Sequence, residues 1–305
     1  MFDLRYHIAS LAAVFIAIAV GIVIGVAIAS GNKVPKSTLG LKNSQIASLK
    51  HQLDGRAASL DDARAELSAV TELLKDVYPG LMSGRLTGQS YAVLYLGQKD
   101  NAARKGVEDA LAAAGAGTPV RSTTLSLSFD PAALVKRVQG SGTFADLTDV
   151  GAIGRELGRQ YAVGSDSLWS LVRDTLVQES TGPLDTAVSG VVVVGDWLPD
   201  PTKDPVQKAR NTAAQELLDG VLQGLADSGL KVVGVESFKG DGDQSTLNGF
   251  QGLSTVNDVD LLPGQVALGM LLATEDTGHY GIAAPDGVIP DLSPLLVAQA
   301  PASGG

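Results

Sequence analysis

The chain has 305 residues, no cysteine and a formal net charge of −10, with 45% hydrophobic and 18% charged residues. The absence of cysteine excludes a disulfide scaffold, an iron–sulfur protein and any thiolate metal site. The acidic balance argues against a nucleic-acid partner, which would require a basic face. This charge is unevenly distributed, because the first 80 residues carry a net charge of +1 and the remainder −11.

An uncharged apolar segment, residues 8–30, follows a short N-terminal flank of residues 1–7. As a helix, its 23 residues would extend roughly 34 Å, enough to cross a hydrocarbon core of about 30 Å. The segment is apolar around its whole circumference, so it predicts a transmembrane helix in the lipid bilayer. A cleaved signal peptide is the alternative, since Ala27-Ile28-Ala29 offers a cleavage signature, but signal peptides usually have shorter apolar regions.

Small residues recur at every fourth position of this segment, which places them on one stripe of a helix. They are Ala13, Ala17, Gly21, Gly25 and Ala29. In lipid, such a stripe lets two helix backbones approach closely and pack. The stripe therefore predicts self-association of the span, although an Ala/Gly-rich segment also produces this spacing by chance.

A linker of residues 31–37 precedes a seven-residue repeat, which predicts a coiled-coil stalk over residues 38–78. The apolar core positions, called the stalk seam below, are Ile46, Leu49, Leu53, Leu60, Ala63, Leu67, Val70, Leu74 and Val77. Gly55 and Arg56 weaken the middle of the repeat, and Tyr78-Pro79-Gly80 ends it. The stalk could pair with a second copy or with a partner's helix; alternatively, it is a single amphipathic helix folded back on the acidic domain.

The acidic part, residues 88–298, alternates apolar strand candidates with helical patterns, and a flexible tail of residues 299–305 follows it. The expected strands are residues 91–96, 120–127, 190–195 and 231–236. The expected helices are residues 101–114, 131–138, 150–161, 168–177, 205–226 and 263–272. Continuous apolar strands that alternate with helices predict a mostly parallel, three-layer α/β domain with helices on both faces of the sheet.

Ligands of open α/β sheets bind beyond the carboxyl ends of the strands. The sequence places Asp100, Asp196 and Trp197 there, as a possible ligand site of the domain. Neither a phosphate-binding glycine loop nor a nucleophile elbow accompanies them, and aspartates in such loops more often cap helices. We therefore expect a protein that is not an enzyme, with no catalytic residue and no cofactor.

Metal ligands are sparse and scattered along the chain. The histidines are His7, His51 and His279, and the methionines are Met1, Met82 and Met270. A copper(I) site requires grouped Cys or Met, and a zinc site requires convergent His or Cys. The sequence predicts no metal site.

The N-terminal sequence MFDLRYHIASLAAVFIAIAVGIVIG resembles the start of the actinobacterial envelope family of MctB-like copper transport proteins, one branch of which is described as SteB, a cell-division partner. The similarity continues through the stalk, the α/β domain, and the segments 256–260 (VNDVD) and 278–281 (GHYG). This resemblance implies an anchor in the cytoplasmic membrane, rather than the outer membrane, with the stalk and domain outside the cytoplasm. The lysines that flank the span leave the orientation open by themselves.

The resemblance implies two functions. One is a non-enzymatic scaffold that acts through its coiled coil, together with a membrane partner, to regulate a peptidoglycan hydrolase at cell division. The other is copper homeostasis or copper efflux through a pore. The span, the small-residue stripe and the stalk favour the scaffold, while copper transport is the alternative, and a ligand binder or enzyme working at Asp196 is a third possibility.

Overall fold

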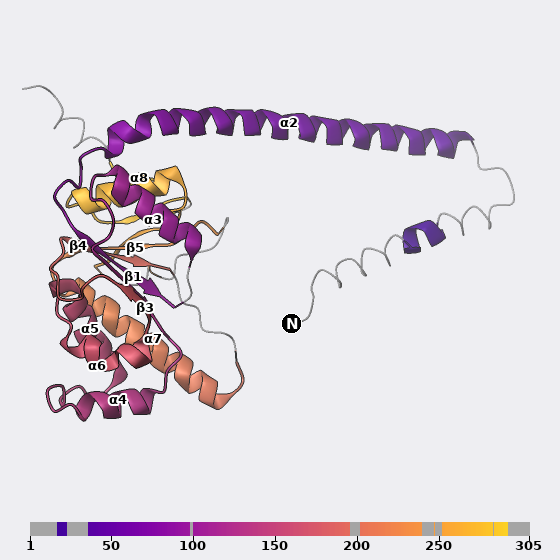
Figure 1. The fold of residues 1–305 in the computed structure, drawn as a ribbon. Helices are drawn as coiled ribbons and strands as arrows, with labels where there is room; N and C mark the ends of the chain where they lie inside the picture. Colours follow the sequence, from indigo (N-terminus) through magenta and orange to yellow (C-terminus); the bar gives the residue numbers. More distant parts are fainter. Residues whose placement is uncertain are drawn as a thin grey trace, which may run out of the picture. The chain divides into compact units, whose positions relative to one another are not determined.

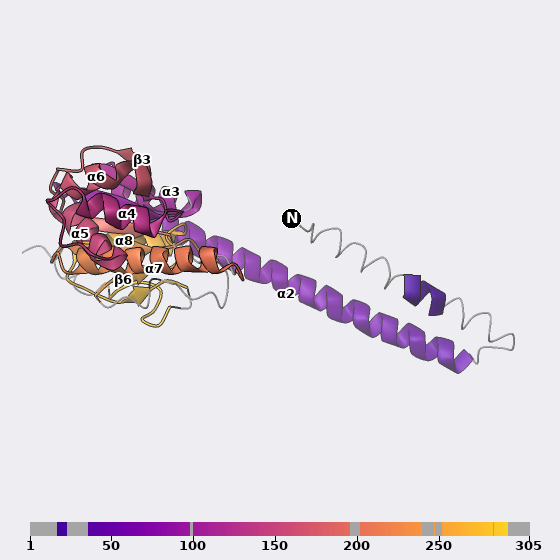
Figure 2. The same ribbon diagram turned by 90° about the horizontal axis from the view of Figure 1, so that it is seen from below.

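The computed structural model describes residues 17–22, 36–97, 100–195, 202–239, 247, 252–282 and 284–291, with the side chains of the first long helix described from residue 48 on. The chain divides into two compact units between Thr71 and Glu72. Helix α2 (Lys36–Met82) contributes to both units and runs without a break over 47 residues (Figure 2). The second unit contains an α/β domain.

Most of the predicted transmembrane segment, including Ala13, Gly25 and Ala29, lies outside the described residues. Ala17 and Gly21 belong to the helical residues 17–22. Among the helices that the structure describes, none combines the length and the hydropathy needed to cross a membrane. The span therefore stays a prediction.

In the described part of the domain, seven strands form one sheet in the order β3-β2-β1-β4-β5-β6-β7. The strands are β1 (Tyr91–Leu96), β2 (Arg121–Leu125), β3 (Val177–Thr181), β4 (Gly190–Val194), β5 (Lys231–Val235), β6 (Ser254–Val256) and β7 (His279–Tyr280). Neighbouring strands are parallel except for β2 and β3. The prediction of a mostly parallel sheet is therefore confirmed.

Helices cover both faces of this sheet, with α3 and α8 on one face and α4, α5, α6 and α7 on the other (Figure 1). Their bounds are α3 (Asn101–Ala113), α4 (Pro131–Gln139), α5 (Val150–Val163), α6 (Ser167–Leu176), α7 (Pro205–Ala226) and α8 (Leu262–Ala273). Strand β1 shows why two helical layers are required, because all six of its residues are buried. Its even-numbered side chains join one apolar cluster and its odd-numbered side chains the other. The three-layer prediction is confirmed.

Helix α2 continues past Pro79, where the heptad pattern ends, as far as Met82. Proline in a helix removes one backbone hydrogen bond. Burial offsets that loss, because the Met82 side chain is fully buried in the apolar cluster beside α8, and Tyr78 and Leu81 pack against the same cluster. The last turns of α2 are therefore part of the domain core.

Three short strands, β3, β6 and β7, were not predicted from the sequence. Strand β3 pairs antiparallel with β2 at the sheet edge, and its central residues Gln178 and Glu179 are exposed. Strands β6 and β7 contain only three and two residues. Each run is too short or too polar for an apolar pattern to stand out, and His279 lies in β7.

Helices α5 and α7 contact each other through glycines. A β-carbon added to Gly158 would lie 2.1 Å from the Val221 carbonyl oxygen, and one added to Gly224 would lie 2.0 Å from the Arg155 carbonyl oxygen. Gly154 and Gly220 have equally close backbone neighbours. Both helices therefore carry two glycines four residues apart at the contact, a spacing that lets helix backbones touch.

We predict that Gly158→Ala destabilises the domain by ~3 kcal/mol, because the added methyl group forces two packed backbones apart. The measurement is chemical denaturation of the full-length chain. Gly80→Ala is the matched control, since Gly80 is also helical and a β-carbon there would meet no atom within 4 Å. Equal losses of stability in the two variants would contradict the predicted contact.

Candidate functional site

The stalk seam lies exposed on α2 over the part of the helix whose side chains are described. Leu49, Leu53, Leu60, Leu67, Val70 and Val77 are 42% to 67% exposed. Leu74 is half-buried, and the side chain of Ile46 lies outside the described residues. A run of large apolar side chains in water at heptad spacing is typical of a helix that binds another helix. Its pairing stays a prediction.

The second candidate site is the carboxyl edge of the sheet. Strands β1 and β4 are neighbours there although they are far apart in the sequence, so their ends flank the point where the strand order reverses. Ligands of doubly wound α/β sheets bind at such a point. Asp100 lies on this edge, whereas Asp196 and Trp197 lie outside the described residues.

Asp100 is the N-cap of α3, and both of its carboxylate oxygens are occupied. Oδ1 accepts hydrogen bonds from the backbone N–H groups of Ala102 and Ala103, at 2.9 and 3.0 Å. Oδ2 accepts one from Ser237 Oγ, on the segment after β5. Partial burial acts to raise the pKa of Asp100, but the bonds from Ser237, Ala103 and Ala102 and the charge of Lys239 hold it below its usual value.

The capped terminus determines which ligands this edge suits. A helix N-terminus binds phosphate through free backbone N–H groups. At α3 the carboxylate of Asp100 already uses two of them. The described side chains nearby are of mixed charge, because Glu236 is buried after β5 and Asp260 accepts a bond from the Phe238 N–H, while the positive charge of Lys239 acts on Asp100. The capped N-terminus of α3 is therefore not an open anion site.

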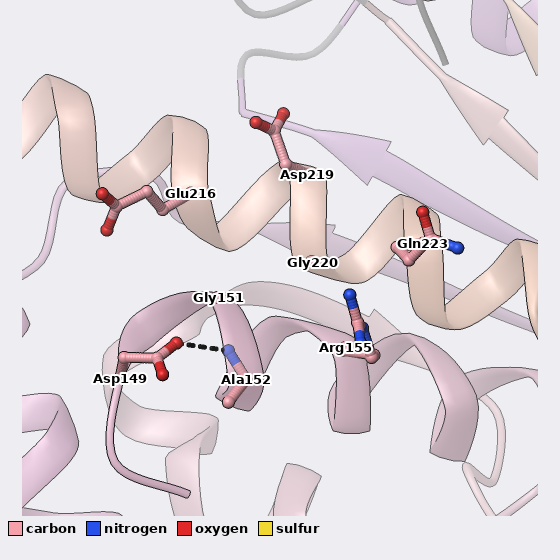
Figure 3. A pocket seen from close by; sticks show the side chains of 8 residues that line it. All are labelled: Asp149, Gly151, Ala152, Arg155, Glu216, Asp219, Gly220 and Gln223. Atoms are coloured by element: carbon pink, nitrogen blue, oxygen red, sulfur yellow. Dashed lines mark hydrogen bonds between the residues drawn. The ribbon is translucent and has the colours of Figure 1, made fainter. Parts of the chain in front are cut away.

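A groove runs along the outer side of the α5–α7 contact (Figure 3). It is lined by Asp149, Gly151, Ala152, Arg155, Glu216, Asp219, Gly220 and Gln223. Two glycines form part of its lining at the helix contact, and the Asp149 carboxylate is occupied as the N-cap of α5 by the Ala152 N–H. The groove exists because the glycines at the helix contact have no side chains to fill it. None of the described residues that line it has a buried, unpaired polar group that would indicate a ligand.

No group of three or more His, Asp or Glu side chains in the described part of the chain could hold a metal ion. Met82 and Met270 are buried in the apolar core. His279 Nδ1 lies 2.9 Å from Thr255 Oγ1 in a hydrogen bond, and His51 lies on the exposed stalk. Met82 and Met270 therefore serve core packing, and His279 takes part in a local hydrogen bond.

A family model described as copper transport outer membrane protein, MctB, matches residues 1–290. A search of the curated proteins found no match. The family match covers the predicted anchor, the stalk and nearly the whole α/β domain. The chain therefore belongs to the MctB family of copper transport outer membrane proteins.

Proposed function

We propose that this chain is a membrane-anchored, non-enzymatic scaffold of the cell envelope. Residues 8–30 anchor it in the cytoplasmic membrane, and the stalk and α/β domain lie outside the cytoplasm. The stalk seam forms a coiled coil with a second copy or with the helix of a membrane partner. Through that coiled coil the protein regulates a peptidoglycan hydrolase at cell division.

The exposed stalk seam is the observation that carries this proposal. Full burial of one Leu or Val side chain contributes about 1.5–3 kcal/mol. Six seam side chains are largely exposed in the single chain, so pairing with another helix would recover a substantial part of that free energy. The polar residues on the rest of the helix favour a coiled coil over burial of the whole helix in a core.

Two further observations support a role that is not enzymatic. Asp100, at the edge where an α/β enzyme would hold its ligand, uses one carboxylate oxygen to cap α3 and the other to accept a bond from Ser237. In addition, the groove beside α5 and α7 is explained by helix packing. The domain then serves to present or position the stalk.

We predict that Leu60→Asp combined with Leu67→Asp weakens self-association or partner binding at least a hundredfold. The reason is that two buried apolar contacts, worth about 3 kcal/mol or more together, are replaced by charges. Sedimentation equilibrium of the full chain in detergent measures self-association. Pull-down from envelope extracts measures capture of the membrane partner and the hydrolase.

The matched control is Ala58→Asp combined with Ala65→Asp. It introduces the same charges seven residues apart on the opposite side of the same helix, where Ala58 and Ala65 are exposed. We expect this control to bind like the unaltered chain and to restore cell separation to a deletion strain. If both double variants lose binding to the same degree, the seam is not the interface.

Copper homeostasis is the second candidate function, and the family description favours it. Under the scaffold proposal, the full chain should not compete with a strong copper(I) chelator such as bicinchoninate, because Met82 and Met270 are core residues and His279 is hydrogen-bonded. Cells that carry the seam variant should keep normal copper content while they fail to separate. Tight copper(I) binding, or copper accumulation in a deletion strain that divides normally, would exclude the scaffold.

A further inference from the structure

A polar clamp holds the segment after β7 onto the end of β6. Asn257 Nδ2 donates a hydrogen bond to the carbonyl oxygen of Ile282, at 3.1 Å. The N–H of Ile282 donates to Asp258 Oδ2, at 3.3 Å. Two consecutive side chains thus hold both polar groups of one residue, which fixes the position of the chain that follows β7.

The other oxygen of each clamp side chain has no partner. Among the described residues, Asn257 Oδ1 and Asp258 Oδ1 are buried side-chain atoms without a hydrogen bond. Asp258 is fully buried. Leaving a buried acceptor unsatisfied is costly, so each such atom requires an explanation.

The two unpaired oxygens lie close to the same point. A β-carbon added to Gly281 would lie 1.9 Å from Asn257 Oδ1 and 2.9 Å from Asp258 Oδ1. Turning the Asn257 amide over would aim a donor at Asp258, but it would place Oδ1 against the carbonyl oxygen of Ile282. One hydrogen shared between the two oxygens would satisfy both acceptors.

We propose that Asp258 is protonated in the closed clamp and donates a hydrogen bond from Oδ1 to Asn257 Oδ1. This single proton satisfies both orphaned oxygens and completes the clamp around Ile282. Loss of the proton leaves a buried carboxylate beside an amide oxygen, and the two repel each other. The clamp is therefore a proton-controlled device that holds residues 278–282 against β6 and releases them when Asp258 ionises.

The charges around Asp258 favour the protonated form. Helix α8, which packs over Asp258 at Gly264, contains no charged residue. The remaining titratable groups on the surrounding elements are Glu236 and Asp260 on the sheet edge, Asp276, His279, Tyr280 and Asp286 around β7, and Arg104, Lys105, Glu108 and Asp109 on α3. Burial raises the pKa of Asp258 to about 6, against bonds from the backbone N–H groups of Ile282 and of Asp258 itself, and the charge of Asp260 raises it further.

The direction of the pH effect follows from this raised pKa. The folded protein keeps the proton on Asp258 up to about pH 6, whereas an unfolded chain releases it near pH 4. The folded state therefore binds the extra proton between these values, so the contribution of Asp258 to stability is complete below about pH 4 and is lost as the pH rises toward 6.

The test compares thermal and chemical unfolding of the full-length chain and of Asp258→Asn, in detergent, from pH 4 to pH 8. Asparagine can donate to Asn257 permanently and cannot ionise. We expect the folding equilibrium constant of the unaltered chain to fall about a hundredfold relative to Asp258→Asn between pH 4 and pH 7. Asp260→Asn is the matched control and should keep most of the pH dependence, since the ionising group is still present.

Hydrogen exchange of the unaltered chain provides a measurement that needs no variant. After correction for intrinsic exchange rates, the amides of residues 278–282, 284, 286 and 287 should exchange more slowly at pH 5 than at pH 7.5. The proposal is overturned if Asp258→Asn keeps the pH profile of the unaltered chain or if this segment exchanges equally at both pH values. It is also overturned if added sodium, potassium or calcium ions stabilise the clamp at constant pH, because a cation would then lie between the two oxygens.

Discussion

The fold depends on one pair of parallel strands, β1 and β4, which are hydrogen-bonded neighbours although almost a hundred residues separate them. Both strands are buried on both faces, so neither can exist without a helical layer above and below. Helices α3 and α8 satisfy one face, and α4 to α7 satisfy the other. The same pairing gathers the strand ends at one edge, where the Asp100 cap, Ser237 and the Asn257–Asp258 clamp all lie.

Capping explains part of the domain's acidity. Asp100, Asp130, Asp149 and Asp204 each accept hydrogen bonds from the first turn of the helix that follows. A negative charge is most favourable at this end of a helix, because the backbone dipoles and unpaired N–H groups meet there. These four carboxylates serve helix ends, so the net charge of the domain is a poor guide to the charge of a ligand.

The sequence predicts an element well when one type of residue, repeated at a fixed spacing, determines that element. The valines of β4 and the apolar residues of β1 mark the buried strands, and the helices between them follow. Glycine contacts are different, because Gly158 and Val221 meet only after α5 and α7 have been placed by the sheet. The same holds for Asp258, whose environment depends on Gly264 and Gly281 from two later segments. The VNDVD segment stands out in the sequence, but nothing in it indicates a clamp.

The domain and the stalk differ in whether their large apolar side chains are buried or exposed, and this difference bears on function. In the domain, the buried apolar side chains form two clusters, and the aspartates at four helix ends are bonded within the chain. On the stalk, apolar side chains as large as leucine lie in water at regular spacing. Exposed apolar side chains of this kind are stabilised when another molecule covers them, so this surface is the first candidate for a binding site. For this reason the scaffold proposal rests on the exposed seam of α2.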